Sequence, residues 1–238
     1  VAPIQQPVDD PTAMTEQIKA LTLELGACMV GIAPLTDDML KEGHLWDYPY
    51  VISFGVEMNR EAALQAPSLH SGLQIQAEYR ETDRISAQLA DHIRGMGWEA
   101  ESAIHKLIEI PAAVEAGLGQ LGKHGSMLSK ELGSMYRLGS VVTRLPLVTD
   151  EPEDIGVDDF CARCQICVTN CPPHAIFDTK QMVRGRERWY VDFDKCIPYF
   201  VENHGCGICI GVCPWSDPGR GESISLKMLA QRSKASGD

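Results

Sequence analysis

Cysteine placement constrains this chain more than any other feature, because eight of its nine cysteines lie between residues 161 and 213. Residues 161–173 read CARCQICVTNCPP, in which two, two and three residues separate successive cysteines and a proline follows the last. A second group contains Cys206 and Cys209, ends in Cys213 before Pro214, and is preceded by Cys196. Such density in a small secreted protein indicates disulfides, but the repeated C-x2-C spacing favours metal binding here.

Two kinds of metal centre use thiolates at this spacing. Runs of this kind, closed by Cys-Pro, are typical of bacterial proteins with two [4Fe–4S] clusters, in which the last cysteine of each run ligates the other cluster. That rule assigns one cluster to Cys161, Cys164, Cys167 and Cys213, and the other to Cys171, Cys196, Cys206 and Cys209. Two structural zinc sites are the alternative, because C-x2-C pairs also suit tetrahedral zinc. The x2-x2-x3 run and the two Cys-Pro endings favour iron–sulfur, and Cys196 is the least constrained ligand.

Composition limits the remaining possibilities. The chain has 238 residues, 44% of them hydrophobic and 23% charged, which is ordinary for a globular protein with a sizeable core. No run of eighteen apolar residues occurs, so we expect no membrane span. The net charge of −12 opposes binding to nucleic acid, and the densest basic segment is only Arg184, Arg186 and Arg188. Residues 1–11 show no apolar signal core, so the cytoplasm is the expected compartment, with a cleaved export signal left open.

Helices and strands are expected to alternate ahead of the cysteines. An apolar stripe predicts a first helix that Asp10 caps and Gly26 ends. Buried strands are expected at residues 28–35 and 50–58, with Cys28 as a small buried apolar side chain.

Four further elements follow before the cysteine runs. Residues 78–100 carry the pattern of a second amphipathic helix, and residues 102–111 that of an edge strand ended by a proline. Residues 112–125 predict a short helix opening into a glycine-rich turn, and residues 136–147 another strand. This alternation predicts an α/β or α+β sandwich.

An acidic, aperiodic segment at residues 148–160 predicts a domain boundary. The expected order is an N-terminal arm at 1–13, the α/β domain at 14–155, the cysteine-rich domain at 156–218, and a tail at 219–238. That tail is expected to be a short helix fading into disorder.

Several segments resemble a known family. DKCIPYFVENHGCGICIGVCPWSDP, at residues 194–218, is similar to the cluster segment of corrinoid-dependent reductive dehalogenases and of epoxyqueuosine reductase, a tRNA-modifying relative. IPAAVEAGLGQLGKHG and YRLGSVVTRLPL resemble the stretch that lines the corrinoid pocket in both families. LTLELGACMVGIAPL and YPYVISFGVEM look like the opening elements of the same family, so the resemblance extends from about residue 14 to 218.

The resemblance implies a nitroreductase-like domain that binds cobalamin, joined to a dicluster ferredoxin-like module. Tyr79, which matches a tyrosine that opens a helix in the family, would donate a proton to the carbon that loses halide. Lys123 would be the cation that lowers the pKa of this phenol and holds the leaving group. His105 and His124 are expected at the surface and are assigned no role.

The glycine-rich segment offers candidate cofactor contacts. Glycines without a side chain can let a backbone approach a cofactor closely, and they serve equally well as turn and helix-end residues. The candidates are Gly117, Gly119, Gly122 and Gly125.

The expected function is reductive cleavage of a carbon–halogen or related carbon–heteroatom bond in a small organic substrate. A ferredoxin, flavodoxin or reductase would supply the electrons. The chain is much shorter than respiratory reductive dehalogenases, so a homodimer or partner subunit could complete the corrinoid pocket. A corrinoid-free dicluster electron carrier is the alternative. Epoxyqueuosine reduction is less favoured, because the chain lacks the helical repeats that engage tRNA and is strongly acidic.

Overall fold

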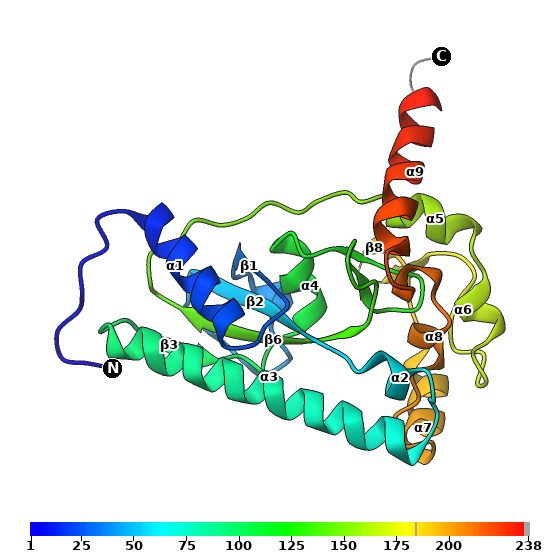
Figure 1. Ribbon diagram of the computed structural model, residues 1–238, viewed down its shortest axis with the longest axis horizontal. Helices are drawn as coiled ribbons and strands as arrows, with labels where there is room; N and C mark the ends of the chain where they lie inside the picture. The colour runs from blue at the N-terminus through cyan, green and yellow to red at the C-terminus, as the bar shows by residue number, and fades with distance from the viewer. Residues whose placement is uncertain (184, 236–238) are drawn as a thin grey trace. The chain divides into compact units, whose positions relative to one another are not determined.

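A computed structural model describes residues 1–183 and 185–235 (Figure 1). The chain folds into two compact units, and each unit is built from three separate segments of the sequence. The first unit consists of Val1–Glu57, Glu78–Leu118 and Tyr136–Glu153. The second consists of Met58–Ala77, Gly119–Met135 and the chain from Asp154 onward. The boundary predicted after residue 155 lies beside the last of these crossings. Residues 58–77 and 119–135, predicted to be part of the first domain, pack in the second unit.

The first unit is built on an antiparallel four-stranded sheet with the order β1-β2-β6-β3. The strands are β1 (Met29–Pro34), β2 (Tyr50–Glu57), β3 (Ala100–Ser102) and β6 (Tyr136–Thr143). The strands predicted at residues 28–35, 50–58 and 136–147 are therefore confirmed. Six consecutive residues of β2 are buried, because β2 lies inside the sheet and helices cover both faces.

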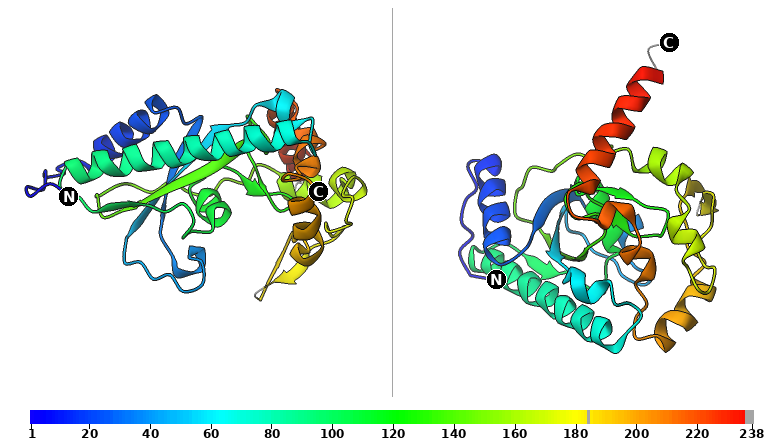
Figure 2. Two further views of the ribbon diagram at one scale, coloured as in Figure 1. Left: turned by 90° about the horizontal axis from the view of Figure 1, so that it is seen from below. Right: turned by 45° about the vertical axis from the view of Figure 1, so that its right-hand side comes forward.

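Helices pack on both faces of the sheet and complete this unit (Figure 2). α1 (Pro11–Glu24) and the later turns of α3 (Leu69–Gly95) cover one face, where Ile18 and Leu89 pack against Ile52. α4 (Glu109–Glu115) covers the other face, and the short 3-10 helix η1 (Asp37–Met39) packs there as well. Asp10 caps α1 as predicted, since its carboxylate accepts hydrogen bonds from two backbone N–H groups of the first turn. The predicted α/β sandwich is confirmed, with an antiparallel sheet.

Three sequence predictions are wrong in this unit. Residues 102–111 do not form an edge strand, because the strand ends at Ser102 and Pro111 lies in the first turn of α4. A proline is tolerated there because the first-turn N–H groups have no partner inside the helix. The second amphipathic helix begins at Leu69, so Tyr79 lies within α3 and does not open it. Cys28 is exposed, because it precedes the edge strand β1, and its Sγ donates to the Gly55 carbonyl at 3.2 Å.

The second unit packs its elements around three small hydrophobic clusters. Its elements are α2 (Arg60–Ala63), β4 (Gln120–Leu121), β5 (Met127–Leu128), α5 (Val157–Arg163), α6 (Ile166–Thr169), β7 (Gln181–Val183), β8 (Arg186–Arg188), α7 (Phe193–Glu202), α8 (Ile208–Gly211), η2 (Pro214–Ser216) and α9 (Arg220–Ala235). The first turns of α3 also belong to it. Trp215 is fully buried and packs edge-on against Phe160, with ring centroids 6.0 Å apart.

The C-terminal segment is more ordered than predicted. α9 runs to Ala235 and buries Ile224 and Met228 in the same core as Trp215, so the predicted fading into disorder is wrong as far as residue 235. Residues 236–238 of that tail and Arg184 of the basic segment lie outside the described residues. None of the helices within residues 1–183 and 185–235 has the length and apolar character that a membrane span requires.

Candidate functional site

The first group of thiols gathers where α5, α6 and η2 meet in the second unit. Burial raises the pKa of the Cys161 thiol to about 12, and the neighbouring thiols Cys167 and Cys164 contribute to that shift. Burial likewise raises the pKa of Cys213 to about 12, and the thiols beside it are those of Cys161, Cys164 and Cys167. Four cysteines that come from two sequence groups therefore share one environment.

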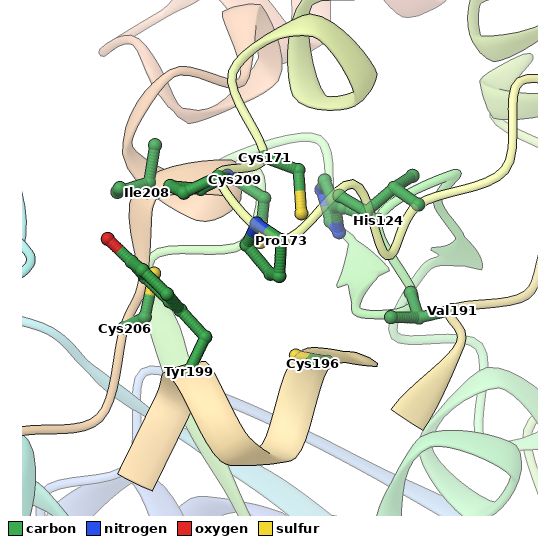
Figure 3. Close-up of a pocket in the computed structure, with 11 residues that line it drawn as sticks. His124, Cys171, Pro173, Val191, Cys196, Tyr199, Cys206, Ile208 and Cys209 are labelled. Atoms are coloured by element: carbon green, nitrogen blue, oxygen red, sulfur yellow. The ribbon is translucent and has the colours of Figure 1, made fainter. Parts of the chain in front are cut away.

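The second group surrounds a cavity in the same unit (Figure 3). Cys171, Cys196, Cys206 and Cys209 all line it. Burial raises the pKa of Cys209 to about 12, and all three of its companions in the cavity add to the shift. Cys167 of the first group also acts on Cys209, so the two groups of thiols are neighbours.

Backbone N–H groups are directed at several of these sulfur atoms. The Ala175 N–H donates to the Cys171 Sγ at 3.4 Å. Hydrogen bonds from the backbone of Ile208 and of Trp215 act against burial and lower the pKa values of Cys206 and Cys213. Donors of this kind stabilise thiolate charge, which is what a cluster ligand carries.

The donor set fits iron–sulfur clusters better than the zinc alternative. All eight cysteines are free of disulfides. Over the described part of the chain, no three His, Cys, Asp or Glu side chains converge closely enough to hold a single metal ion. Two adjacent groups of four thiols suit two larger cubane clusters, whereas a zinc ion requires ligands within about 2.3 Å.

Lys123 lies beside the first group of thiols. It is only 1% exposed, and its Nζ donates to the Cys164 carbonyl at 2.9 Å. The same ammonium group lies 4.8 Å from the centroid of the Trp189 ring. Its backbone N–H and its charge both lower the pKa of Cys161. The observed contacts of Lys123 are thus with a cluster ligand loop, and its role toward Tyr79 stays a prediction.

His124 was expected at the surface, but it is buried and lines the cavity of the second thiol group. Burial lowers the pKa of His124 to about 4, so the imidazole is neutral at physiological pH. Its Nδ1 accepts the Ser126 N–H at 3.2 Å, and its Nε2 lies 3.4 Å from the Ser134 hydroxyl. His124 follows Lys123 directly in the glycine-rich turn, and only its place in the fold reveals its burial. His105 is exposed as expected.

Protein atoms occupy the space beside the four candidate glycines. A Cβ at Gly117 would lie 2.7 Å from the Glu151 carbonyl, and one at Gly119 would lie 2.2 Å from the Leu128 carbonyl. A Cβ at Gly122 or Gly125 would meet side-chain carbons of Leu128 or Val191 at 2.9 and 2.8 Å. These contacts support the turn and packing alternative for the glycines, since a side chain at any of the four positions would meet protein atoms.

Tyr79 belongs to the first unit and is 43% exposed. The Arg137 guanidinium lies 5.2 Å from the centroid of its ring, in the geometry of a cation–π contact. Arg137 Nε is buried, has no hydrogen-bond partner among the described residues, and lies 4.0 Å from a carboxylate oxygen of Glu78. Arg137 stands on β6 within a segment that the sequence predicted only as a strand, so its position beside Tyr79 was missed.

Glu109 is a second ionisable group that sequence reasoning missed. Burial of its carboxyl raises the pKa of Glu109 to about 7, although the Ser140 hydroxyl donates to Oε1 at 3.0 Å. The other oxygen, Oε2, is buried and lacks a hydrogen-bond partner within the described residues. The sequence does not indicate that Glu109 is buried, because a glutamate is an ordinary surface residue in most contexts.

Comparison with known families agrees with the thiol arrangement. Residues 160–216 match the family described as the 4Fe-4S dicluster domain. This match lies within the predicted cysteine-rich domain, and the chain carries two [4Fe–4S] clusters.

Comparison with individual proteins confirms the resemblance stated from the sequence. The chain is 36% identical over 176 residues to the tetrachloroethene reductive dehalogenase of Sulfurospirillum multivorans, covering 70% of this chain and 35% of that protein. A solved structure of the catabolic reductive dehalogenase NpRdhA, in complex with 3-bromo-4-hydroxybenzoic acid, has a TM-score of 0.85 at 30% identity. It covers 93% of this chain and 35% of that one. The chain thus spans about a third of the length of these relatives.

Epoxyqueuosine reductases are also homologous. The Synechococcus enzyme is 32% identical over 151 residues, covering 56% of this chain and 43% of that protein. A solved epoxyqueuosine reductase bound to a tRNA stem loop has a TM-score of 0.58 at 17% identity, over 87% of this chain and 66% of that one, and this likeness shows the fold alone.

Proposed function

We propose that this chain is the cluster-bearing part of a corrinoid-dependent reductive dehalogenase-type oxidoreductase. The observation that carries the proposal is the pair of adjacent four-thiol groups, within a chain homologous to reductive dehalogenases. The reaction consumes two electrons and one proton and converts a carbon–halogen bond into a carbon–hydrogen bond and halide. Two one-electron centres side by side suit the delivery of those electrons.

The cluster ligands follow the grouping of the thiols. Cys161, Cys164, Cys167 and Cys213 would hold one cluster, called cluster one below, and Cys171, Cys196, Cys206 and Cys209 would hold the other, called cluster two. Burial keeps metal-free thiols protonated, so binding of iron must displace their protons. The N–H donors and Lys123 offset part of that cost by stabilising thiolate charge.

Tyr79 would supply the proton. It is accessible from solvent, and the Arg137 guanidinium lies over its ring in a cation–π contact. We propose Arg137, rather than Lys123, as the cation beside this phenol. Cobalamin, when bound, would supply the low-valent cobalt that exchanges electrons with the substrate.

The substrate class is a small halogenated organic molecule. One homologue is named for tetrachloroethene, and a structural relative is bound to 3-bromo-4-hydroxybenzoic acid. These two compounds are the natural first substrates to test.

Anaerobic purification with analysis of iron and cobalt tests the proposal most directly. We expect about eight irons per chain, since each cluster holds four, and about one cobalamin after reconstitution with hydroxocobalamin. Reduced methyl viologen as electron donor should then support halide release from one of the two compounds. Protein that contains iron, binds no cobalamin and releases no halide would contradict the proposal.

A tyrosine variant tests the proton donor separately. Tyr79→Phe should retain iron and cobalamin but lose at least about 100-fold in turnover, which is the low end of what a general acid contributes. Tyr50→Phe, on β2 of the same unit, is the matched control and should turn over normally. Equal rates in the two variants would exclude Tyr79 as the donor.

A corrinoid-free electron carrier is the second candidate. The two adjacent thiol groups support it as well, because two clusters can relay electrons without a corrinoid. The cobalt analysis separates the two candidates, since a carrier would exchange electrons normally while binding no cobalamin. Epoxyqueuosine reduction is disfavoured by the net charge of −12, which opposes binding of tRNA.

A further inference from the structure

The helix α7 exposes an apolar face to solvent. Phe193, Ile197, Phe200 and Val201 follow the i, i+4, i+7, i+8 pattern of a single helix face. All four are exposed, and Val201 reaches 71%. A pattern of this kind ordinarily marks the face that a helix buries, so an exposed example indicates a contact surface.

The same helix also contributes to the cluster site. Cys196 and Tyr199 line the cavity of the second thiol group, and Figure 3 shows both side chains rising from this helix toward that cavity. Ile197 is the neighbour of Cys196 in the sequence. Cys196 also lies three residues after Phe193 and four before Phe200, so it stands at the border of the apolar face, and a molecule seated there would lie close to a ligand of cluster two.

The beginning of α3 continues the apolar surface within the same unit. Gly72 of α3 packs so closely on the end of α7 that a Cβ there would lie 2.4 Å from the His204 carbonyl. Leu69 and Leu73, on either side of Gly72, are both exposed. We call the six exposed side chains the α7 face, and its members are Leu69, Leu73, Phe193, Ile197, Phe200 and Val201.

The charged residues of α7 are mostly acidic. Asp194 and Glu202 are exposed, whereas the one lysine of the helix, Lys195, lies 3.3 Å from Asp192 and is neutralised by it. The whole chain carries a charge of −12. A partner with an apolar centre and a basic rim is complementary to this surface.

We propose that the α7 face is the docking site of a one-electron donor protein whose redox centre lies behind an apolar patch ringed by basic residues. One electron passes from the reduced centre of the donor to oxidised cluster two, and no bond or proton is exchanged. This inference rests on the relay that the proposed function requires. It adds where electrons enter, what kind of surface delivers them, and that cluster two receives them before cluster one.

The position of Cys196 favours an electron donor over other occupants. A second copy of this chain would be as acidic as the first, so two such faces would repel each other. A donor requires a short path to a cluster, and the α7 face provides it because Cys196 lies at its border.

Electron exchange with cytochrome c tests the proposal without any dehalogenation. Cytochrome c is a basic one-electron carrier with lysines around an exposed apolar haem edge, so it has the chemistry proposed for the donor. The protein with reconstituted clusters is reduced with dithionite, desalted anaerobically and mixed with ferricytochrome c in a stopped-flow instrument. Each electron that leaves a cluster reduces one haem iron from the ferric to the ferrous state.

The decisive variants alter apolarity and charge separately. Ile197→Asn with Val201→Asn removes apolar contacts without adding charge. The matched control is Met182→Asn with Leu226→Asn, since these side chains are also exposed, Leu226 by 64%, but lie on β7 and α9. Asp194→Lys with Glu202→Lys reverses the acidic rim.

We expect the Ile197/Val201 variant to lose about tenfold in the second-order rate with cytochrome c, and the control pair to stay within about twofold. The charge-reversal variant should also slow about tenfold, and the wild-type rate should fall as salt is raised. Iron content and the rate with oxidised methyl viologen, which needs no docking, should be equal in all variants.

Equal rates for the Ile197/Val201 variant and its control would overturn the docking site. A wild-type dimer that this variant converts to monomer, with an unchanged cytochrome c rate, would assign the face to a second copy instead. Failure of the clusters to exchange electrons even with methyl viologen would refute the relay, and thus the proposed function itself. The absence of cobalamin would refute the corrinoid chemistry while leaving the docking result intact.

Discussion

The two units differ in how their chemically important residues come together. In the second unit, Cys161, Cys164 and Cys167 lie within seven consecutive residues, so local spacing alone brings them into one group. In the first unit, Tyr79 on α3 and Arg137 on β6 meet only because the helix packs on the sheet. Short-range spacing therefore specifies a metal centre, whereas tertiary packing assembles the proposed proton-donor pair.

Loss of a cluster ligand should have the largest effect and should be confined to one unit. Cys167→Ser replaces a buried thiolate with a weaker ligand, so we expect cluster one to be lost and about four of the eight irons with it. The core around Trp215 contains Cys161 and Cys213 and should loosen as a result. Iron analysis and electron paramagnetic resonance of the reduced protein measure the loss.

Cys28→Ser is the matched control for this experiment. Cys28 is the ninth cysteine, is exposed and lies in the first unit, so its replacement should leave the iron content unchanged. Retention of both clusters in Cys167→Ser would show that this cysteine is not a ligand. Loss of all iron would show that the adjacent clusters depend on each other.

The same contrast explains which parts of the fold were predictable. The apolar runs at residues 28–35, 50–58 and 136–147 identified three of the four strands in the sheet of the first unit, because a buried strand is a continuous apolar run. Residues 102–111 share that apolar character, but Pro111 suits the first turn of a helix as well as the end of a strand. No local sequence signal shows that residues 58–77 and 119–135 pack in the second unit, because that packing depends on contacts between residues far apart in sequence.

The candidate site divides along the same line. The spacing rule grouped the cysteines as they are found around the cavity of Figure 3 and around Cys213. Sequence reasoning could not place the cations: Lys123 contacts the loop of Cys164, and Arg137 lies over Tyr79. It also missed His124, because burial of a histidine after a glycine-rich turn depends on what packs over that turn.

Glu109 should make the stability of the first unit depend on pH. A carboxyl with an ordinary pKa of 4.5 that is raised to about 7 binds its proton more tightly in the folded state. Its contribution to stability is fully present below about pH 4.5 and is lost as pH rises to about 7. We expect the free energy of unfolding to fall by on the order of 3 kcal/mol over that window. Anaerobic urea unfolding followed by circular dichroism at several pH values measures the fall.

Glu109→Gln should remove this pH dependence and make the protein more stable than wild type at pH 8. The substituted amide keeps the size of the side chain and carries no charge to bury. Glu115→Gln, on the exposed side of the same helix, should behave as wild type. An unchanged pH profile in Glu109→Gln would mean that the carboxyl is solvated in both states.

Replacement of Lys123 should have the smallest of the expected effects, a shift in the reduction potential of cluster one. Its ammonium is buried and donates to the Cys164 carbonyl, and its charge lowers the pKa values of Cys161 and Cys167. The same charge should stabilise cluster one more as electrons are added. Lys123→Gln should therefore lower the reduction potential of cluster one by on the order of tens of millivolts, because local charge and hydrogen bonds set cluster potentials.

A redox titration monitored by electron paramagnetic resonance distinguishes this role from the one that the family resemblance implies. If Lys123 serves cluster one, the potential of that cluster falls while cluster two keeps its value, and Lys227→Gln on the exposed side of α9 changes neither. If Lys123 instead assists Tyr79, turnover falls steeply with both potentials unchanged. Because the ammonium already donates to the Cys164 carbonyl, we expect the first result, which would make Arg137 the cation that serves the phenol.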